Sequence, residues 1–251
     1  IYTLQYTLSL HDALPISIKN PEVKMTFSRA GKEVEIKLHT VTYAQVKNCL
    51  YNEWEDTNRA LVDRLGDGQI AYTHMRDMGS EELNEFLKDM HTRTLGKKAI
   101  IIDLRYNNGG NVHNEVLEFL SQKAHYQWAY RDFPSNSHPN VTPGDIPIIA
   151  LVNERSLSDA EVTSNGIQTL GLATIVGTET YRWIIFTSGT TLLDGSYLRL
   201  PAWGCYSLDG KDLGSTGVKP DIYVKNTFED RLKGRDPQLE RAIEEALKRI
   251  K

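Results

Sequence analysis

The stretch that decides the fold is Ala99-Ile-Ile-Ile-Asp-Leu-Arg-Tyr-Asn-Asn-Gly-Gly110. It opens with an apolar run of strand length and ends in paired glycines, after which a helical pattern begins. A strand that is apolar on both faces is typical of a buried parallel sheet. Glycines at such a turn let the backbone approach a ligand and aim N–H groups at an anion, although an ordinary strand-to-helix turn explains them equally well.

Strands and helices alternate on both sides of this stretch. We expect strands at 69–75, 99–104, 146–152 and 173–176, and helices at 80–90, 112–121 and 158–170. This alternation predicts an α/β domain with a parallel-rich sheet and flanking helices, in which sites form at the carboxyl ends of strands. An Asp194-Gly195 turn predicts a hairpin at 190–201, and apolar residues at helical spacing predict a closing helix at 237–250.

The chain divides into three segments. Residues 1–17 contain Tyr6-Thr-Leu-Ser-Leu-His-Asp-Ala-Leu-Pro-Ile16, which reads like the in-frame translation of a sequencing adaptor. A short amphipathic strand or a damaged signal peptide are the alternatives, so a cytoplasmic and a periplasmic location both stay open. Residues 18–42 carry the alternating pattern of a hairpin at 23–41, which is too small to be stable alone. Residues 43–251 form the main domain, opened by an amphipathic helix at 51–65.

Composition excludes several classes of protein. The 251 residues carry a formal net charge of -4, which offers no basic field for nucleic acid. Cys49 and Cys205 are far apart and outside any metal-ligand spacing, so we expect no zinc site and no disulfide framework. No dinucleotide fingerprint indicates a cofactor, and no apolar run reaches the roughly 20 residues of a membrane-spanning helix.

Two residues could carry nucleophilic chemistry. His74 ends a predicted strand directly before a break, where an α/β fold displays catalytic groups, although a lone histidine there is more often hydrogen-bonded in a core or turn. Ser158 follows another strand and opens a helix, and its spacing to Glu161 is that of a capping box, which is a sufficient local explanation. The positive end of the helix would also stabilise an alkoxide, provided that a base is near. His113 is the rival histidine and is interpreted as helix surface.

Four blocks in this order resemble the tricorn-like branch of the C-terminal-processing (tail-specific) serine protease family. They are Gln69-Ile-Ala-Tyr-Thr-His-Met75, the stretch 99–110, Asn153-Glu-Arg-Ser-Leu-Ser-Asp-Ala-Glu161 with Ile175-Val-Gly-Thr178, and Thr216-Gly-Val-Lys-Pro-Asp-Ile222. The resemblance covers nearly everything from residue 23 onward. It implies a ClpP/crotonase-like core preceded by a PDZ-like domain, of which residues 18–42 would be the remnant. Members of the family tend to form homo-oligomers, so the resemblance also implies one here.

The resemblance assigns roles to residues that match the family pattern. Ser158 becomes the nucleophile, His74 the general base, and Thr73 the hydroxyl residue that orients the histidine. Backbone N–H groups of Asp159 and of the Gly109-Gly110 pair, with that of Gly109 favoured, become the oxyanion hole. Relatives with a Ser/Lys dyad carry a lysine where this chain has Trp183, so that mechanism is not expected.

Two departures bear on activity. Relatives complete the relay with a glutamate where this chain has Gly214, and loss of a carboxylate that orients the base can cost orders of magnitude in rate. Asp209, Asp212 and Ser215 are the candidates to replace it. In addition, Tyr181-Arg-Trp-Ile-Ile-Phe186 is bulky where relatives are glycine-rich, which would narrow or close the substrate pocket.

Three functions remain open from the sequence. The first is a serine-type peptidase that hydrolyses peptides or unfolded chain ends through an acyl-enzyme, without metal or organic cofactor. The second is an impaired relative that binds peptides without efficient turnover. The third is an unrelated esterase or other hydrolase that uses the same residues.

Overall fold

A computed structural model describes residues 22–141 and 143–250. The described residues form two units, one that ends at Asp56 and one that begins at Thr57. In the first unit, β1 (Glu22–Arg29) and β2 (Lys32–His39) form the expected antiparallel hairpin. Helix α1 (Tyr43–Leu65) runs across the boundary and begins eight residues before its predicted start at 51. The adaptor-like segment 1–17 lies outside the described residues, and a PDZ origin for residues 18–42 stays a prediction.

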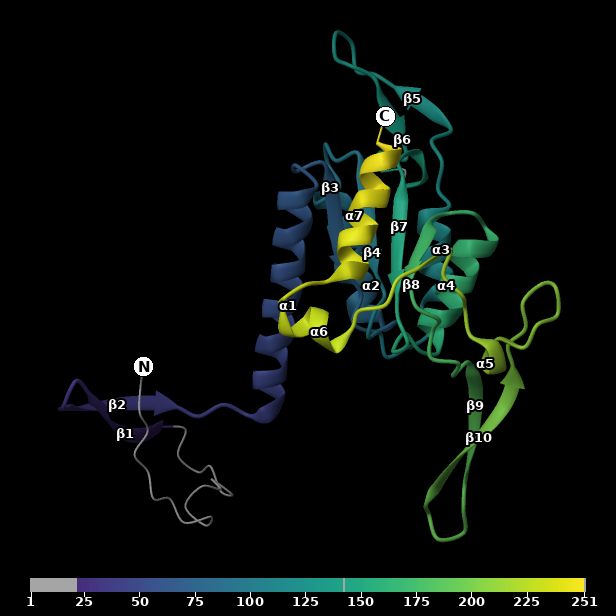
Figure 1. The fold of residues 1–251 in the computed structure, drawn as a ribbon. Helices are drawn as coiled ribbons and strands as arrows, with labels where there is room; N and C mark the ends of the chain where they lie inside the picture. The colour runs from purple at the N-terminus through teal and green to yellow at the C-terminus, as the bar shows by residue number, and fades with distance from the viewer. Residues whose placement is uncertain (1–21, 142, 251) are drawn as a thin grey trace. The chain divides into compact units, whose positions relative to one another are not determined.

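A five-stranded parallel sheet forms the centre of the second unit (Figure 1). Its spatial order is β11-β8-β7-β4-β3, so the apolar run of the stretch 99–110 supplies an interior strand, β4. Every residue of β3, β4 and β7 is buried, which is why these strands read as continuous apolar runs. The prediction of an α/β fold with a parallel-rich sheet is confirmed. The strands are β3 (Ile70–His74), β4 (Ala99–Asp103), β7 (Ile148–Val152), β8 (Thr174–Gly177) and β11 (Ile222–Tyr223).

Helices cover both faces of this sheet. On one face, which we call the α4 face, α2, α3 and α4 pack against side chains such as Ala71, Ile100 and Ile102. On the other, the α7 face, helix α7 and the end of α1 pack against Ile70, Tyr72 and residues of the neighbouring strands. Figure 1 shows α7 in front of the sheet and the three other helices behind it. The helices are α2 (Ser80–Thr92), α3 (His113–Leu120), α4 (Asp159–Thr169) and α7 (Pro237–Arg249).

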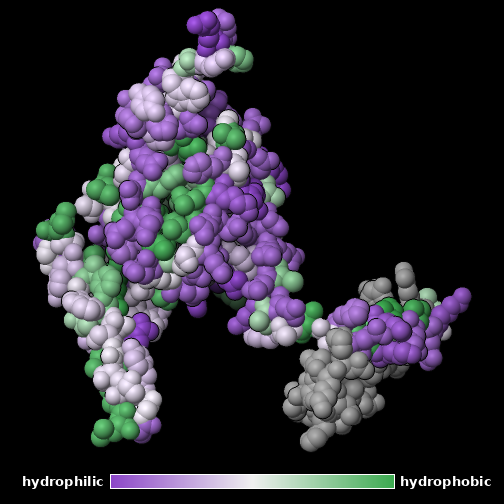
Figure 2. Space-filling model, turned by 180° about the vertical axis from the view of Figure 1, so that it is seen from behind, coloured by the Kyte–Doolittle hydropathy of each residue, from purple (hydrophilic) through white to green (hydrophobic). Residues whose placement is uncertain are grey.

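Two hairpins and three short helical turns lie outside the sheet. The hairpin expected at 190–201 is longer than predicted, because its first strand begins at Ile185. Exposed apolar side chains gather along it, as Figure 2 shows. No helix in the described ranges is long and apolar enough to cross a membrane. These elements are β5 (Tyr126–Trp128), β6 (Asn136–His138), η1 (Pro143–Asp145), β9 (Ile185–Thr191), β10 (Tyr197–Gly204), α5 (Leu213–Thr216) and α6 (Phe228–Leu232).

Candidate active site

Ser158 lies at a strained turn between β7 and α4. Its φ of 56° and ψ of -117° fall outside the regions that residues with a side chain normally occupy. Such strain persists only where surrounding contacts impose it, and it gathers at functional sites. Ser158 directly precedes Asp159, the first residue of α4, so it occupies the positive end of that helix.

The side chain of Glu161 holds this turn in its conformation. Its side chain is fully buried and accepts four hydrogen bonds, two on each oxygen. Oε2 accepts the amides of Ser158 and Trp183, both at 2.9 Å. Oε1 accepts the Thr180 hydroxyl at 2.6 Å and the Arg182 amide at 2.7 Å. Glu161 therefore does more than cap α4, because its carboxylate also joins the serine turn to the segment after β8.

The glycine loop lies directly against Ser158. A Cβ atom on Gly109 would come within 2.6 Å of the serine Cβ and 3.2 Å of its Oγ, and Gly109 has a φ of +77°. A Cβ on Gly110 would meet the Met78 carbonyl oxygen at 2.1 Å. Only glycine fits at either position. The Leu157 amide donates to the Asn107 carbonyl at 3.1 Å, which ties the loop to the residue before Ser158.

Two backbone amides at this turn have no acceptor among the described residues. They are those of Gly110 and Asp159. The Gly109 amide, by contrast, donates to Asn107 Oδ1 at 2.9 Å. Of the three expected oxyanion-hole amides, the geometry therefore favours Gly110 and Asp159 over Gly109, because a donor for a developing oxyanion must not be engaged elsewhere.

The structure does not bring His74 to this turn. Side chains alternate along β3, so His74 shares the α7 face with Tyr72 and pairs in register with Asp103 of β4. Its Nε2 lies 2.8 Å from the Arg105 carbonyl oxygen. Ser158 instead begins α4, on the other face of the sheet. These contacts give no support to His74 as the base of Ser158, and that assignment stays a prediction.

Thr73 also differs from its expected role. Alternation turns it to the α4 face, where its hydroxyl donates to Asp89 Oδ2 at 3.1 Å. It therefore points away from His74 and does not orient the imidazole. The sequence could not show which way the side chains of Thr73 and His74 face.

The surroundings of His74 form a buried ionic cluster around Arg105. The guanidinium is 1% exposed and pairs with Asp103 at 2.7 Å and with Asp236, the residue before α7, at 2.8 Å. Burial alone would raise the pKa of Asp103, but the Arg105 charge and its hydrogen bonds hold that pKa below its usual value. Burial lowers the pKa of His74, although Asp103 opposes this effect. These groups hold α7 on the sheet.

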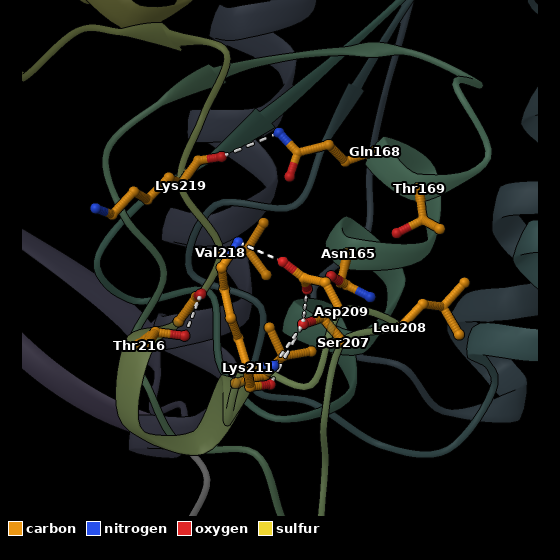
Figure 3. Close-up of a pocket in the computed structure, with 12 residues that line it drawn as sticks. Asn165, Gln168, Thr169, Ser207, Leu208, Asp209, Lys211, Thr216, Val218 and Lys219 are labelled. Atoms are coloured by element: carbon orange, nitrogen blue, oxygen red, sulfur yellow. Dashed lines mark hydrogen bonds and ion pairs between the residues drawn. The ribbon is translucent and has the colours of Figure 1, made fainter.

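The proposed acid partners also lie away from His74. Asp212 caps α5 by accepting the Gly214 amide at 2.9 Å, and the Ser215 hydroxyl donates to the Asp212 carbonyl at 3.0 Å. Asp209 pairs with Lys211 at 2.6 Å on the rim of a cavity of about 580 Å³. Figure 3 shows this cavity between the outer side of α4 and the segment 207–219. These contacts give no support to a relay from any of the three to His74, which stays a prediction.

The structure corrects the interpretation of His113 as helix surface, because its side chain is partly buried against Asp159. Its Nδ1 lies 2.5 Å from Asp159 Oδ1, and its side chain is only 18% exposed. Sequence gave no signal for this pair beyond the position of His113 three residues after the glycines. Among the described residues, no group of three or more metal-ligating side chains is arranged to hold an ion.

The bulky segment after β8 is tied to the serine turn through its backbone. The amides of Arg182 and Trp183 bind the Glu161 carboxylate, so the backbone of this segment supports the serine turn. The side chains of Tyr181 and Trp183 stack with ring centroids 5.6 Å apart and are about half exposed. Bulk at these positions therefore surrounds the site with aromatic surface.

The chain is similar to several known proteins. The sequence profile of Peptidase family S41 matches residues 68–224. The chain is 31% identical over 204 residues to the tricorn protease of Thermoplasma acidophilum, covering 80% of this chain and 19% of that protein. It is 26% identical over 185 residues to a carboxy-terminal-processing protease of Bartonella bacilliformis, covering 69% and 43%. The crystal structure of the tricorn protease superposes with a TM-score of 0.77 at 27% identity, over 91% of this chain and 22% of that one. The chain thus spans about a fifth of the length of these tricorn proteins.

Proposed function

The chain belongs to peptidase family S41, which confirms the resemblance and the class of serine peptidase, and from this premise we propose that it hydrolyses peptide bonds with Ser158 as nucleophile. One observation carries the proposal. A serine is held in a strained conformation at a helix N-terminus, against glycines that leave no room for other side chains. Its substrate is a peptide or an unfolded chain end, and a homo-oligomer stays a prediction.

The acyl-transfer step uses groups at this turn. Ser158 Oγ forms a bond to the carbonyl carbon, and the carbonyl oxygen takes up negative charge. The amides of Gly110 and Asp159 donate to that oxygen, and the positive end of α4 adds a favourable field. As the C–N bond breaks, the amine leaves with the proton that Ser158 Oγ has given up. Water then adds to the acyl carbon, the bond to Oγ breaks, and the carboxylic product leaves while Oγ regains a proton.

A second candidate function has its own supporting observation. Nε2 of His74 lies against the Arg105 carbonyl oxygen, and Nδ1 of His113 lies against Asp159, so these two ring contacts are not to Ser158. Serine is a weak nucleophile without a base. Gly214 stands where relatives carry a carboxylate. Both facts favour a protein that binds peptides without efficient turnover.

A fluorophosphonate probe separates the two functions. In the proposed enzyme, Ser158 Oγ attacks phosphorus, fluoride leaves, and the probe stays attached. We expect labelling of the chain to be lost in Ser158→Ala and kept in Ser121→Ala, which changes an exposed serine at the end of α3. Mass spectrometry of the labelled peptide locates the modification.

Two outcomes would count against the enzyme. Labelling that survives in Ser158→Ala places the nucleophile elsewhere. A chain that binds an extended peptide in calorimetry but takes up no probe supports the second candidate.

A further inference from the structure

The side chain of Asp159 joins the glycine loop to α4. It is 2% exposed, and Oδ2 accepts the amides of Val112 at 2.8 Å and His113 at 3.1 Å. Oδ1 contacts the His113 ring at Nδ1, 2.5 Å away. We infer that His113 and Asp159 form a clamp that positions the two amides of the oxyanion hole. This inference rests on the proposed function. The side chains of His113 and Asp159 act as positioning groups.

The two amides need such a device because they belong to different elements. The Gly110 amide lies in the loop before α3, and the Asp159 amide opens α4. On one side of them, the Leu157 amide binds the Asn107 carbonyl. On the other side, the Asp159 carboxylate holds the start of α3. The oxyanion donors therefore lie between two ties, and removing either tie lets the donors separate.

The clamp also decides which way the Asp159 charge points. A carboxylate facing the reacting carbonyl would repel the developing oxyanion. Here both oxygens of the Asp159 carboxylate bind donors at the start of α3, so the negative charge is held there. The backbone amide of Asp159, next to Ser158, stays available to the oxyanion. The bond to Oδ1 requires a proton on Nδ1 of His113, since an unprotonated carboxylate only accepts.

Because a fluorophosphonate also develops negative charge on oxygen, its labelling kinetics report on the clamp. In His113→Ala we expect the maximal labelling rate to fall about ten-fold while the probe concentration at half-maximal rate stays the same, as for loss of an interaction made in the transition state. His113→Asn offers an amide donor near the Nδ1 position and should label within about two-fold of the wild type. His91→Ala is the matched control, because His91 lies on the exposed side of α2 and binds its own helix at Leu87.

A double-variant cycle tests whether the two side chains act as a unit. Asp159→Ala removes the carboxylate but keeps the backbone amide, and should lose about as much rate as His113→Ala. The combined variant should lose no more than either single change. Losses that multiply would overturn the clamp.

Hydrogen exchange provides a readout that does not depend on reactivity. Amides in 107–113 and 157–162 should exchange faster in His113→Ala and at the wild-type rate in His113→Asn. If the wild type takes up no probe, the proposed function fails while exchange still tests the clamp. Unchanged exchange in His113→Ala overturns it, and so does an equal loss of labelling in His113→Asn, which would give the imidazole itself a role.

Discussion

At the scale of single residues, the buried carboxylate of Glu161 organises more of the site than any other side chain. It fixes the amide of Ser158 and two amides of the following segment at once. The carboxylate only accepts hydrogen bonds, and all four groups around it donate. A residue of the same shape with a donor in place of one oxygen therefore cannot satisfy this environment.

We expect Glu161→Gln to lower the free energy of unfolding by about 2–4 kcal/mol, because the new NH2 group faces donors and leaves them unpaired in a buried place. Labelling by the fluorophosphonate should slow as well, since the Ser158 turn loses its tie. Urea unfolding followed by circular dichroism measures the first effect. Glu118→Gln, on the exposed side of α3, is the matched control. A stability equal to the wild type would show that the carboxylate is dispensable.

Single residues also show how far the site could be predicted from the sequence. Sequence reasoning grouped Ser158, Asp159 and the glycine pair, and these residues do lie together, because the order of the motifs along the chain fixes their backbone positions. It could not show which face of the sheet His74 takes, because the direction of a side chain at the end of a strand depends on the parity of the strand, and sequence boundaries are uncertain by more than one residue.

At the scale of elements, the ends of the strands are packed so closely that glycine is required. Gly177 ends β8 with a φ of +139°, and a Cβ there would meet the Val152 carbonyl oxygen of β7 at 1.8 Å. Its carbonyl also accepts the Val224 amide, just after β11. The glycine in this block of the sequence thus lets three strands meet.

Gly177→Ala should destabilise the chain by about 3 kcal/mol, because one of two paired backbones must move and the φ is strained. Gly234→Asn is the control, because Gly234 has a φ of +66° in open space and asparagine tolerates that region. We expect the control to stay within about 0.5 kcal/mol of the wild type in urea unfolding. Equal effects of the two substitutions would contradict this account.

The elements found from sequence were those with a strong apolar pattern. All strands of the sheet except β11 were predicted, and so were α2, α3, α4 and α7. The elements that were missed lack such a pattern: β11 has two residues, and β5, β6, α5 and α6 are short and largely exposed. Their conformations depend on caps and neighbours, which a periodicity does not record.

At the scale of the whole molecule, the buried His74 makes stability depend on pH. Above about pH 6.5 the imidazole is neutral in both the folded and the unfolded chain. Below it, the unfolded chain binds a proton that the folded chain takes up only at its lowered pKa. The free energy of unfolding should therefore fall as pH falls through this window, by at most ~1.4 kcal/mol per pH unit from this group.

His74→Gln keeps a donor for the Arg105 carbonyl and does not titrate, so its stability should change less with pH than that of the wild type. Urea unfolding between about pH 7.5 and 5.5 compares the slopes. His91→Gln, which changes an exposed histidine, should retain the wild-type slope. If the free energy of unfolding falls with pH at the same slope in the wild type and in His74→Gln, the pH dependence does not come from His74.

The pairing of Arg105 with Asp236 sets an order for folding during synthesis. These residues are 131 positions apart, and helix α7 begins directly after the aspartate. Until the ribosome has released that helix, the nascent sheet carries one apolar face exposed to water and a guanidinium whose second carboxylate has not arrived. The second unit can thus bury both faces of its sheet only after helix α7 has emerged.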